Sequence, residues 1–323
     1  MKIKNKLLLY LRVFISIGLI IVLCFFMRGR FGELMNTLRS VNLGLFLWAV
    51  ALAGFILVIS AFRLKLLFEI HGIYFSGIEA IRISYMGVFF NNFMPSTIGG
   101  DVVKLYYAKK RAKNLIEPIS SLVMDRILGL TALTFLGAAA LMFKSELMKD
   151  NTAKFIIMVI SLIISVFFVL LFFKGFSLKV VYFCKMFKLV KTEAWIIKLV
   201  DTMSSFRKSS KIFAAFFCAL FGQVVIIFCI YILSRSLLLN LPIATFYVLI
   251  PVIQIVSALP SINGLGIREG AFVYFFKDFI APEYAVALSI LYLGIMIPLS
   301  IAGGFVYMFY GKINTREVES YDQ

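Results

Sequence analysis

Side chains that enzymes use for proton transfer and metal binding are scarce in this sequence. It contains one histidine, His71, and four cysteines that show neither CxxC spacing nor a paired framework. We therefore expect no zinc site and no disulfide scaffold, and we expect the thiols to behave as small apolar side chains. A GxSxG elbow, an HExxH pair and a GxxxxGK(S/T) loop are also missing. These absences predict a protein without a metal, a cofactor or a known catalytic motif.

Charged residues are also few, at 15% of the 323 residues, whereas 62% are apolar and the mean hydropathy is +1.00. So much apolar surface cannot be buried within one water-soluble globule of this size, and lipid must serve as solvent. The 33 basic residues outnumber the 16 acidic ones and give a net charge of +17. Because the basic residues flank apolar runs, we expect anionic lipid headgroups, and no nucleic acid, as their partners.

Membrane-crossing helices are predicted from the length of the apolar runs. About 20 apolar residues are needed to cross about 30 Å of hydrocarbon. The first qualifying run follows MKIKNK and is not followed by a small-residue cleavage site, so we expect a retained signal anchor. Lysine and arginine near the span ends predict a cell-membrane protein with both termini in the cytoplasm. Six runs qualify: 7–26, 43–62, 119–143, 155–173, 212–233 and 284–309.

Two further apolar stretches, 76–111 and 243–279, are interrupted by proline, glycine and ionisable residues. Each contains an apolar helix, a Pro-Ser pair, a glycine-rich turn, a carboxylate and an aromatic-rich helix. If the basic run 104–113 stays inside, the first stretch enters from the cytoplasm and the second from the outside. The pair fits an inverted-topology repeat, in which substrates bind near the midplane, although chance similarity of the two turns is the alternative.

The predicted fold is thus an all-α polytopic membrane protein, a single domain over 1–323 with about six transmembrane helices and two broken or re-entrant helical segments. The connection 175–211 lacks an uninterrupted span but mixes aromatic and aliphatic residues with lysines. We expect it to form one or two amphipathic helices in the plane of the cytoplasmic leaflet. A solvated loop is the alternative.

The candidate substrate-binding residues lie at the two breaks and near the start of the span 119–143. Broken backbone in a membrane is tolerated only where protein or water satisfies its polar groups, so both turns are expected to line a cavity. Proline stops a helix, glycine permits close approach or positive φ, and ionisable groups in membranes tend to be paired and functional. The candidates are Asn91, Asn92, Pro95, Gly99, Gly100, Asp101, Lys104, Asp125, Arg126, Gln254, Pro260, Asn263, Gly264, Gly266, Arg268 and Glu269.

Two of the arginines carry alternative interpretations. Arg268 lies far from any basic loop, where a guanidinium can bind a phosphodiester through paired donors, or it only braces the broken helix with its neighbour Glu269. Arg126 either faces the cavity or reaches back to the membrane interface. The expected ion pairs join Asp101 to Lys104, Asp125 to Arg126 and Arg268 to Glu269.

With these residues the chain resembles the transmembrane family of lysylphosphatidylglycerol synthase and flippase, also called the flippase-like domain family. The matching stretches are NNFMPSTIGGDVVKLYYAKKR, VMDRILGL and PVIQIVSALPSINGLGIREGAFVYF, from about Tyr85 to Phe276. The last is the most specific. The resemblance implies a membrane domain that moves aminoacylated or glycosylated lipids between leaflets. Some members add a cytoplasmic lysyltransferase domain, and because the chain ends at Gln323 we expect no counterpart of it.

The favoured interpretation is translocation of a phospholipid or lipid-linked headgroup of the aminoacyl-phosphatidylglycerol or glycolipid type. One alternative is an intramembrane lipid-modifying transferase resembling phosphatidylglycerol lysyltransferase. Another is a membrane anchor for a separately encoded synthase or glycosyltransferase. The expected partners are a membrane phospholipid substrate and anionic headgroups, and a homo-oligomer stays open.

Overall fold

The computed structural model describes residues 28–93, 99–148, 151–170, 202–203, 205–257 and 266–310. Over these ranges the chain is helical, with short turns and no strand, so the all-α prediction is confirmed. The helices are α2 (Phe31–Arg39), α3 (Leu43–Ile70), α4 (Gly77–Phe93), α5 (Gly99–Lys109), α6 (Ile116–Phe143), α7 (Asn151–Leu170), α10 (Lys211–Ser236), α11 (Ile243–Ser257), α12 (Ile267–Phe276), α13 (Pro282–Gly294) and α14 (Met296–Tyr310). Two 3-10 turns, η1 (Ser145–Leu147) and η2 (Ser205–Lys208), complete the described elements.

Four helical units of the described chain are long and apolar enough to cross a membrane: α3, α6, α10 and the pair α13–α14. They coincide with four of the predicted spans, although α3 continues to Ile70, beyond the predicted end of its span. The predicted span 155–173 overlaps α7, which has 20 residues and ends at Leu170, and residues 171–173 lie outside the described ranges. The predicted span 7–26 lies outside the described residues, as does most of the connection 175–211. The total of six spans therefore stays a prediction.

The last of these units is divided, because α13 ends at Gly294 and α14 begins at Met296. The predicted span 284–309 was one uninterrupted helix. Pro298 explains the difference. Proline has no N–H to donate to the carbonyl of Gly294, four residues earlier, and its ring crowds that carbonyl.

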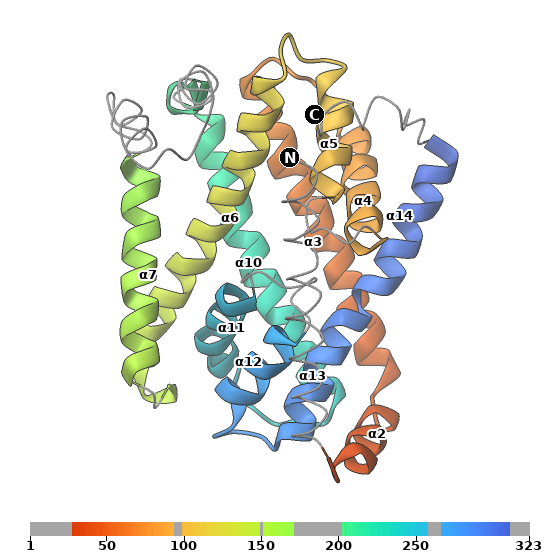
Figure 1. Ribbon diagram of the computed structural model, residues 1–323, viewed down its shortest axis with the longest axis vertical. Helices are drawn as coiled ribbons and strands as arrows, with labels where there is room; N and C mark the ends of the chain where they lie inside the picture. The colour runs from red at the N-terminus through yellow and green to blue at the C-terminus, as the bar shows by residue number, and fades with distance from the viewer. Residues whose placement is uncertain are drawn as a thin grey trace, which may run out of the picture.

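Two helical hairpins, α4–α5 and α11–α12, form the broken segments (Figure 1). The first hairpin lies in the upper half of the view and opens toward the end of the molecule where α3 ends. The second lies in the lower half and opens toward the opposite end. This arrangement agrees with segments that enter from opposite faces. The turns at 94–98 and 258–265 lie outside the described residues, and with them the candidates Pro95, Pro260, Asn263 and Gly264.

Small residues allow the helices to approach one another closely. A Cβ at Gly303 of α14 would clash with the backbone carbonyl of Tyr85 on α4, and one at Gly137 of α6 would lie 2.9 Å from Cβ of Pro251 on α11. Membrane helices are held together by such close packing, because lipid provides no hydrophobic drive between them.

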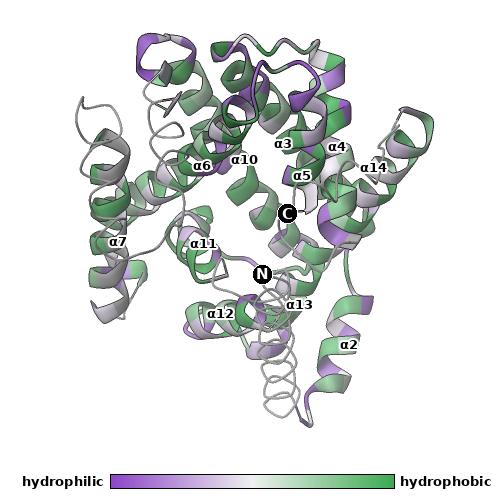
Figure 2. Cartoon of the chain, turned by 45° about the horizontal axis from the view of Figure 1, so that its top comes forward, coloured by the Kyte–Doolittle hydropathy of each residue, from purple (hydrophilic) through white to green (hydrophobic). Residues whose placement is uncertain are grey.

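Large apolar side chains cover the outward faces of the long helices. Leu47 and Trp48 on α3 are 65% and 55% exposed, and Phe213 and Phe217 on α10 are both 67% exposed. Figure 2 shows hydrophobic colouring along these helices and hydrophilic residues gathered in the connections at their ends. An outward apolar surface of this extent is suited to lipid contact. The chain is therefore a multi-pass membrane protein.

Candidate functional site

Five charged side chains from three helices form what we term the charged cluster: Arg63 on α3, Asp101 and Lys104 on α5, and Asp125 and Arg126 on α6. Asp101 is shared, because Lys104 Nζ lies 3.7 Å from Oδ1 and Arg126 Nη2 lies 2.7 Å from Oδ2. Nε of Arg126 also donates to Oδ2 of Asp101, at 3.2 Å. The expected contact of Asp101 with Lys104 is confirmed, and Arg126 joins it.

Asp125 pairs with Arg63 rather than with Arg126. Nε of Arg63 lies 2.6 Å from Oδ1 of Asp125, and the two side chains are only 14% and 8% exposed. The predicted pairing of Asp125 with Arg126 is therefore wrong, because consecutive residues on a helix point in different directions. Arg63 was missed because the span was taken to end at residue 62. The signal was that apolar residues continue past Arg63 to Ile70, interrupted only by Lys65 and Glu69.

The charged cluster lies part-way along the helices rather than at the end of the bundle. Arg126 is about 15 Å along α6 from Ile116, at about 1.5 Å per residue. Its side chain is 58% exposed, whereas those of Asp101 and Lys104 are 20% and 16% exposed. Within the cluster three cations face two carboxylates, which leaves one positive charge in excess. An open guanidinium in such surroundings can accept an anionic group.

Glycine and asparagine join α4 to α5 next to the turn of the first hairpin. A Cβ at Gly100 would clash with the backbone carbonyl of Gly87 and lie 2.8 Å from Nδ2 of Asn91, so α4 and α5 meet where neither has a side chain. Oδ1 of Asn91 accepts a hydrogen bond from the Gly100 N–H at 2.7 Å and satisfies one free amide of the α5 start. Gly99 is buried beside it, and Asn92 is exposed. Asn91 therefore stabilises the hairpin in addition to lying near the cluster.

The second hairpin holds a buried network around Arg268 and Glu269, which are 7% and 6% exposed. Nη2 of Arg268 donates to Oε1 of Glu269 at 2.7 Å, which confirms the expected pair, and Nε donates to Oγ of Ser289 on α13 at 3.1 Å. Oε2 of Glu269 accepts from the N–H of Gly266 at 2.6 Å. Gly266 has φ 81°, the positive value that glycine tolerates. Glu269 thus caps α12, and Arg268 joins it to α13.

The family model described as the lysylphosphatidylglycerol synthase TM region matches residues 10–303. The chain belongs to this family. No curated protein and no solved structure matches it. The family region includes both hairpins, the charged cluster and the buried network of α12. The family-level prediction made from the sequence is therefore confirmed.

Within this family region the candidates separate into two groups. Asp101, Lys104, Asp125 and Arg126 meet in the charged cluster beside the first hairpin, whereas Gly266, Arg268 and Glu269 form the network of the second. Gln254 lies on α11, and its Nε2 is buried without a partner among the described residues. Ser289 was not predicted, because a lone serine in an apolar helix gives no sequence signal.

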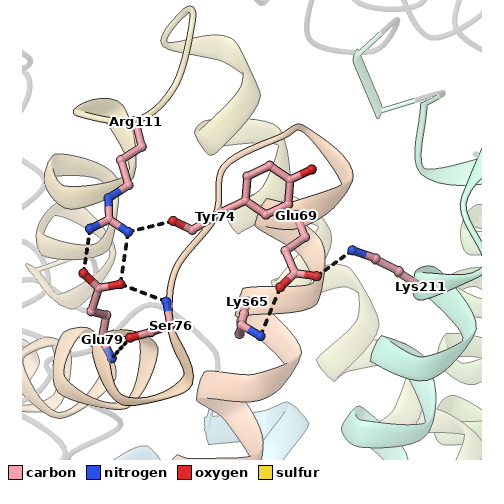
Figure 3. A network of polar contacts seen from close by, with 7 residues as sticks. All are labelled: Lys65, Glu69, Tyr74, Ser76, Glu79, Arg111 and Lys211. Carbon is pink, nitrogen blue, oxygen red and sulfur yellow. Dashed lines mark hydrogen bonds and ion pairs between the residues drawn. The ribbon is translucent and has the colours of Figure 1, made fainter.

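At the end of the bundle where α3 ends, polar contacts join α3 to α6 and α10. Glu69 accepts from Lys65 at 3.1 Å and from Lys211 on α10 at 2.5 Å (Figure 3). Next to it, Nδ1 of His71 contacts Oγ of Ser121 on α6 at 2.9 Å, and Nε2 contacts Oγ of Ser205 at 2.9 Å. Burial lowers the pKa of His71 below its ordinary 6.5. These contacts are structural, since they hold α3, α6 and α10 together.

Proposed function

We propose that this member of the lysylphosphatidylglycerol synthase TM region family translocates a phospholipid or lipid-linked headgroup between the leaflets of the cytoplasmic membrane. Both termini would lie in the cytoplasm. The observation that carries the proposal is the charged cluster, which has a net positive charge and an open guanidinium about 15 Å along α6. Ionisable residues are rarely retained at such depth in membrane proteins unless they serve a pathway or a substrate.

The barrier to lipid transfer is the headgroup, because moving an unpaired charge out of water costs several kcal/mol or more. Arg126 and Lys104 can replace part of the hydration of a phosphate with charge-assisted hydrogen bonds. Asp101 lies between them and can accept a cationic group, such as the amine of an aminoacyl headgroup. A phosphate and an amine could therefore be held together, which favours lipids of the aminoacyl-phosphatidylglycerol type. A glycolipid phosphate would use the two cations alone.

The two opposed hairpins suggest a mechanism by which the site is exposed to each side of the membrane in turn. Transporters with inverted repeats expose a central site to each side in turn by moving one repeat against the other. Here α4–α5 and α11–α12 open toward opposite ends (Figure 1). Because Lys104 and Asp101 belong to the first hairpin and Arg126 to α6, a shift of α5 along α6 would break and remake the contact of Asp101 with Arg126. The acyl chains would stay in the bilayer along the apolar outer faces.

Buried charge in the second hairpin has a different role in this proposal. Among the described residues, Arg268 and Glu269 use each other, Ser289 and Gly266 as partners and are almost fully buried. Such a network suits a rigid element better than a binding surface. We therefore assign headgroup contact to Arg126 and Lys104, and the bracing of α12 to Arg268 and Glu269.

The test uses the purified full chain in liposomes that contain fluorescent phosphatidylglycerol, lysyl-phosphatidylglycerol or a sugar-phosphate lipid. Translocation is measured by the loss of fluorescence when a membrane-impermeant quencher is added. The masses of the recovered lipids are then measured by mass spectrometry. The proposal expects faster leaflet exchange of at least one lipid than in protein-free liposomes, with its mass unchanged. A changed headgroup mass would favour the transferase alternative. Neither exchange nor chemical change for any lipid would favour an anchor for a separately encoded synthase.

A further inference from the structure

A second basic site lies at the open end of the first hairpin, away from the charged cluster. It is a pocket of about 240 Å³ between the start of α4, the end of α5 and the last turn of α14. Its charged lining comes from Glu79 and Arg82 on α4 and from Lys110 and Arg111 after α5, and two tyrosines, Tyr107 on α5 and Tyr310 on α14, also line it. Lys110 is about 9 Å along the chain direction of α5 from Lys104, at about 1.5 Å per residue.

Among the described residues, only one of the three cations in this pocket has a carboxylate partner. Arg111 Nη2 and Nη1 lie 2.6 and 3.1 Å from the two oxygens of Glu79, and Nη1 also donates to the carbonyl of Tyr74 at 2.6 Å (Figure 3). Oε2 of Glu79 in addition accepts from the N–H of Ser76, while Oγ of Ser76 accepts from the N–H of Glu79. This capping box fixes the carboxylate at the start of α4. Glu79 is therefore committed to Arg111 and to the helix.

The same contacts keep Glu79 ionised. Hydrogen bonding to Arg111 lowers the pKa of Glu79 from 4.5 to about 2. Near neutral pH the pocket therefore holds three cations against one permanently charged carboxylate. Two positive charges are left in excess, those of Arg82 and Lys110.

Arg82 and Lys110 are held by aromatic rings rather than by carboxylates in the described part of the chain. Cζ of Arg82 lies 3.9 Å from the ring centroid of Tyr310, and Nζ of Lys110 lies 4.3 Å from that of Tyr106. A guanidinium stacked on a ring keeps its N–H donors in its own plane, where they remain available to an anion. The rings thus orient the two cations without neutralising them.

The surroundings of the pocket point to lipid as the source of the anion. The pocket lies beside the loops that follow α3 and α5, at one end of the apolar bundle, and Tyr310 is 57% exposed. Basic and aromatic side chains gather where membrane proteins meet headgroups. Its volume is below the about 300–1,000 Å³ typical of sites for drug-sized ligands, which suits a phosphate with a small headgroup.

We propose that this pocket binds the phosphate of an anionic phospholipid through Arg82 and Lys110, as an interfacial site separate from the charged cluster. The bound lipid would link the start of α4 to the end of α14, because Arg82 and Tyr310 come from these two helices. The site is defined by equilibrium binding and does not depend on transport.

The experiment counts lipids bound to the purified full chain by native mass spectrometry during titration with phosphatidylglycerol or with zwitterionic phosphatidylcholine. The double variant Arg82→Gln with Lys110→Gln should bind phosphatidylglycerol at least about tenfold more weakly than the wild type, since charge-assisted hydrogen bonds are lost. Lys277→Gln is the matched control, because Lys277 also lies over a tyrosine, Tyr274 at 4.3 Å, but outside the pocket. It should leave phosphatidylglycerol binding unchanged.

A variant with the opposite effect guards against a folding defect. Glu79→Gln raises the pocket charge by one and should strengthen phosphatidylglycerol binding, even if loss of the cap lowers the melting temperature. Equal phosphatidylglycerol affinity in the wild type and the double variant would overturn the proposal, as would equal affinity for phosphatidylcholine. Displacement of the bound lipid by millimolar inorganic phosphate or glycerol phosphate would instead assign the pocket to a soluble phosphate and overturn the lipid source.

Discussion

Removing one partner of the buried pair Arg268–Glu269 should destabilise the protein far more than removing a surface pair. In Arg268→Gln the Glu269 carboxylate stays buried and keeps only Ser289 and the Gly266 N–H among its described partners. Breaking a buried pair by removing one member costs about 3–5 kcal/mol, because the remaining charge is uncompensated. Arg268→Gln is therefore expected to lower the free energy of unfolding by about that amount.

The double variant Arg268→Gln with Glu269→Gln removes both charges together. Residues in one hydrogen-bond network couple by about 0.5–3 kcal/mol, so the double variant should lose less stability than the sum of the single variants. Lys144→Gln is the matched control. Nζ of Lys144 lies 3.6 Å from Oε1 of Glu146, the two side chains are 55% and 76% exposed, and such a surface pair is worth about 0–1 kcal/mol.

Unfolding of the wild type and of four variants, Arg268→Gln, Glu269→Gln, the double variant and the control, in mixed micelles titrated with dodecyl sulfate measures these differences. Losses that simply add would contradict the network and leave the two residues as independent contributors. A loss below about 1 kcal/mol for Arg268→Gln would likewise contradict the bracing role. A stable double variant that has lost lipid transport would return Arg268 to the substrate path.

Three further outcomes are expected. Gly303→Ala should lower the free energy of unfolding by about 1–3 kcal/mol, because its Cβ meets the α4 backbone. Gly270→Ala should not lower it, because nothing lies within 4 Å of the new Cβ. Denaturant titration of the two variants measures the difference. Because burial lowers the pKa of His71, its contribution to stability is present above pH 6.5 and lost as pH falls below that value, so His71→Gln should flatten the melting temperature between about pH 7.5 and 5.5. Single cysteines at Lys109 and Lys144, in a chain without its native cysteines, should label from opposite sides of the membrane, and labelling of both from outside intact cells would refute the re-entrant hairpin.

Most of the helical organisation could be predicted from the sequence, because the length of an apolar run fixes what can cross a bilayer. The two hairpins could be predicted for a related reason, since proline and glycine inside such runs break helices that lipid would otherwise favour. The break between α13 and α14 at Ile295 could also have been predicted, because Pro298 is visible in the sequence. It was not predicted because the residues that flank Pro298 are apolar and were taken as one span.

Partners across the bundle could not be predicted in the same way. The Asp125 carboxylate could have paired with its neighbour Arg126, and only the packing of α3 against α6 brings Arg63 to 2.6 Å from it. Ser289 meets Arg268 for a similar reason, as α12 packs on α13. Such contacts depend on how each helix is rotated about its axis and on the angle at which two helices cross. The spacing of apolar residues in one sequence does not reveal either quantity.

The most direct test of lipid translocation is the initial rate at which the reconstituted chain moves an anionic phospholipid between leaflets, compared with Arg126→Gln and with the control Lys277→Gln. Arg126 carries the exposed guanidinium of the charged cluster, with a side chain that is 58% exposed. Loss of a charge-assisted contact with the moving phosphate should slow the rate about tenfold or more. We expect this loss for Arg126→Gln and an unchanged rate for Lys277→Gln, with both variants folded. Equal rates in the wild type and Arg126→Gln for every lipid would contradict translocation through the charged cluster.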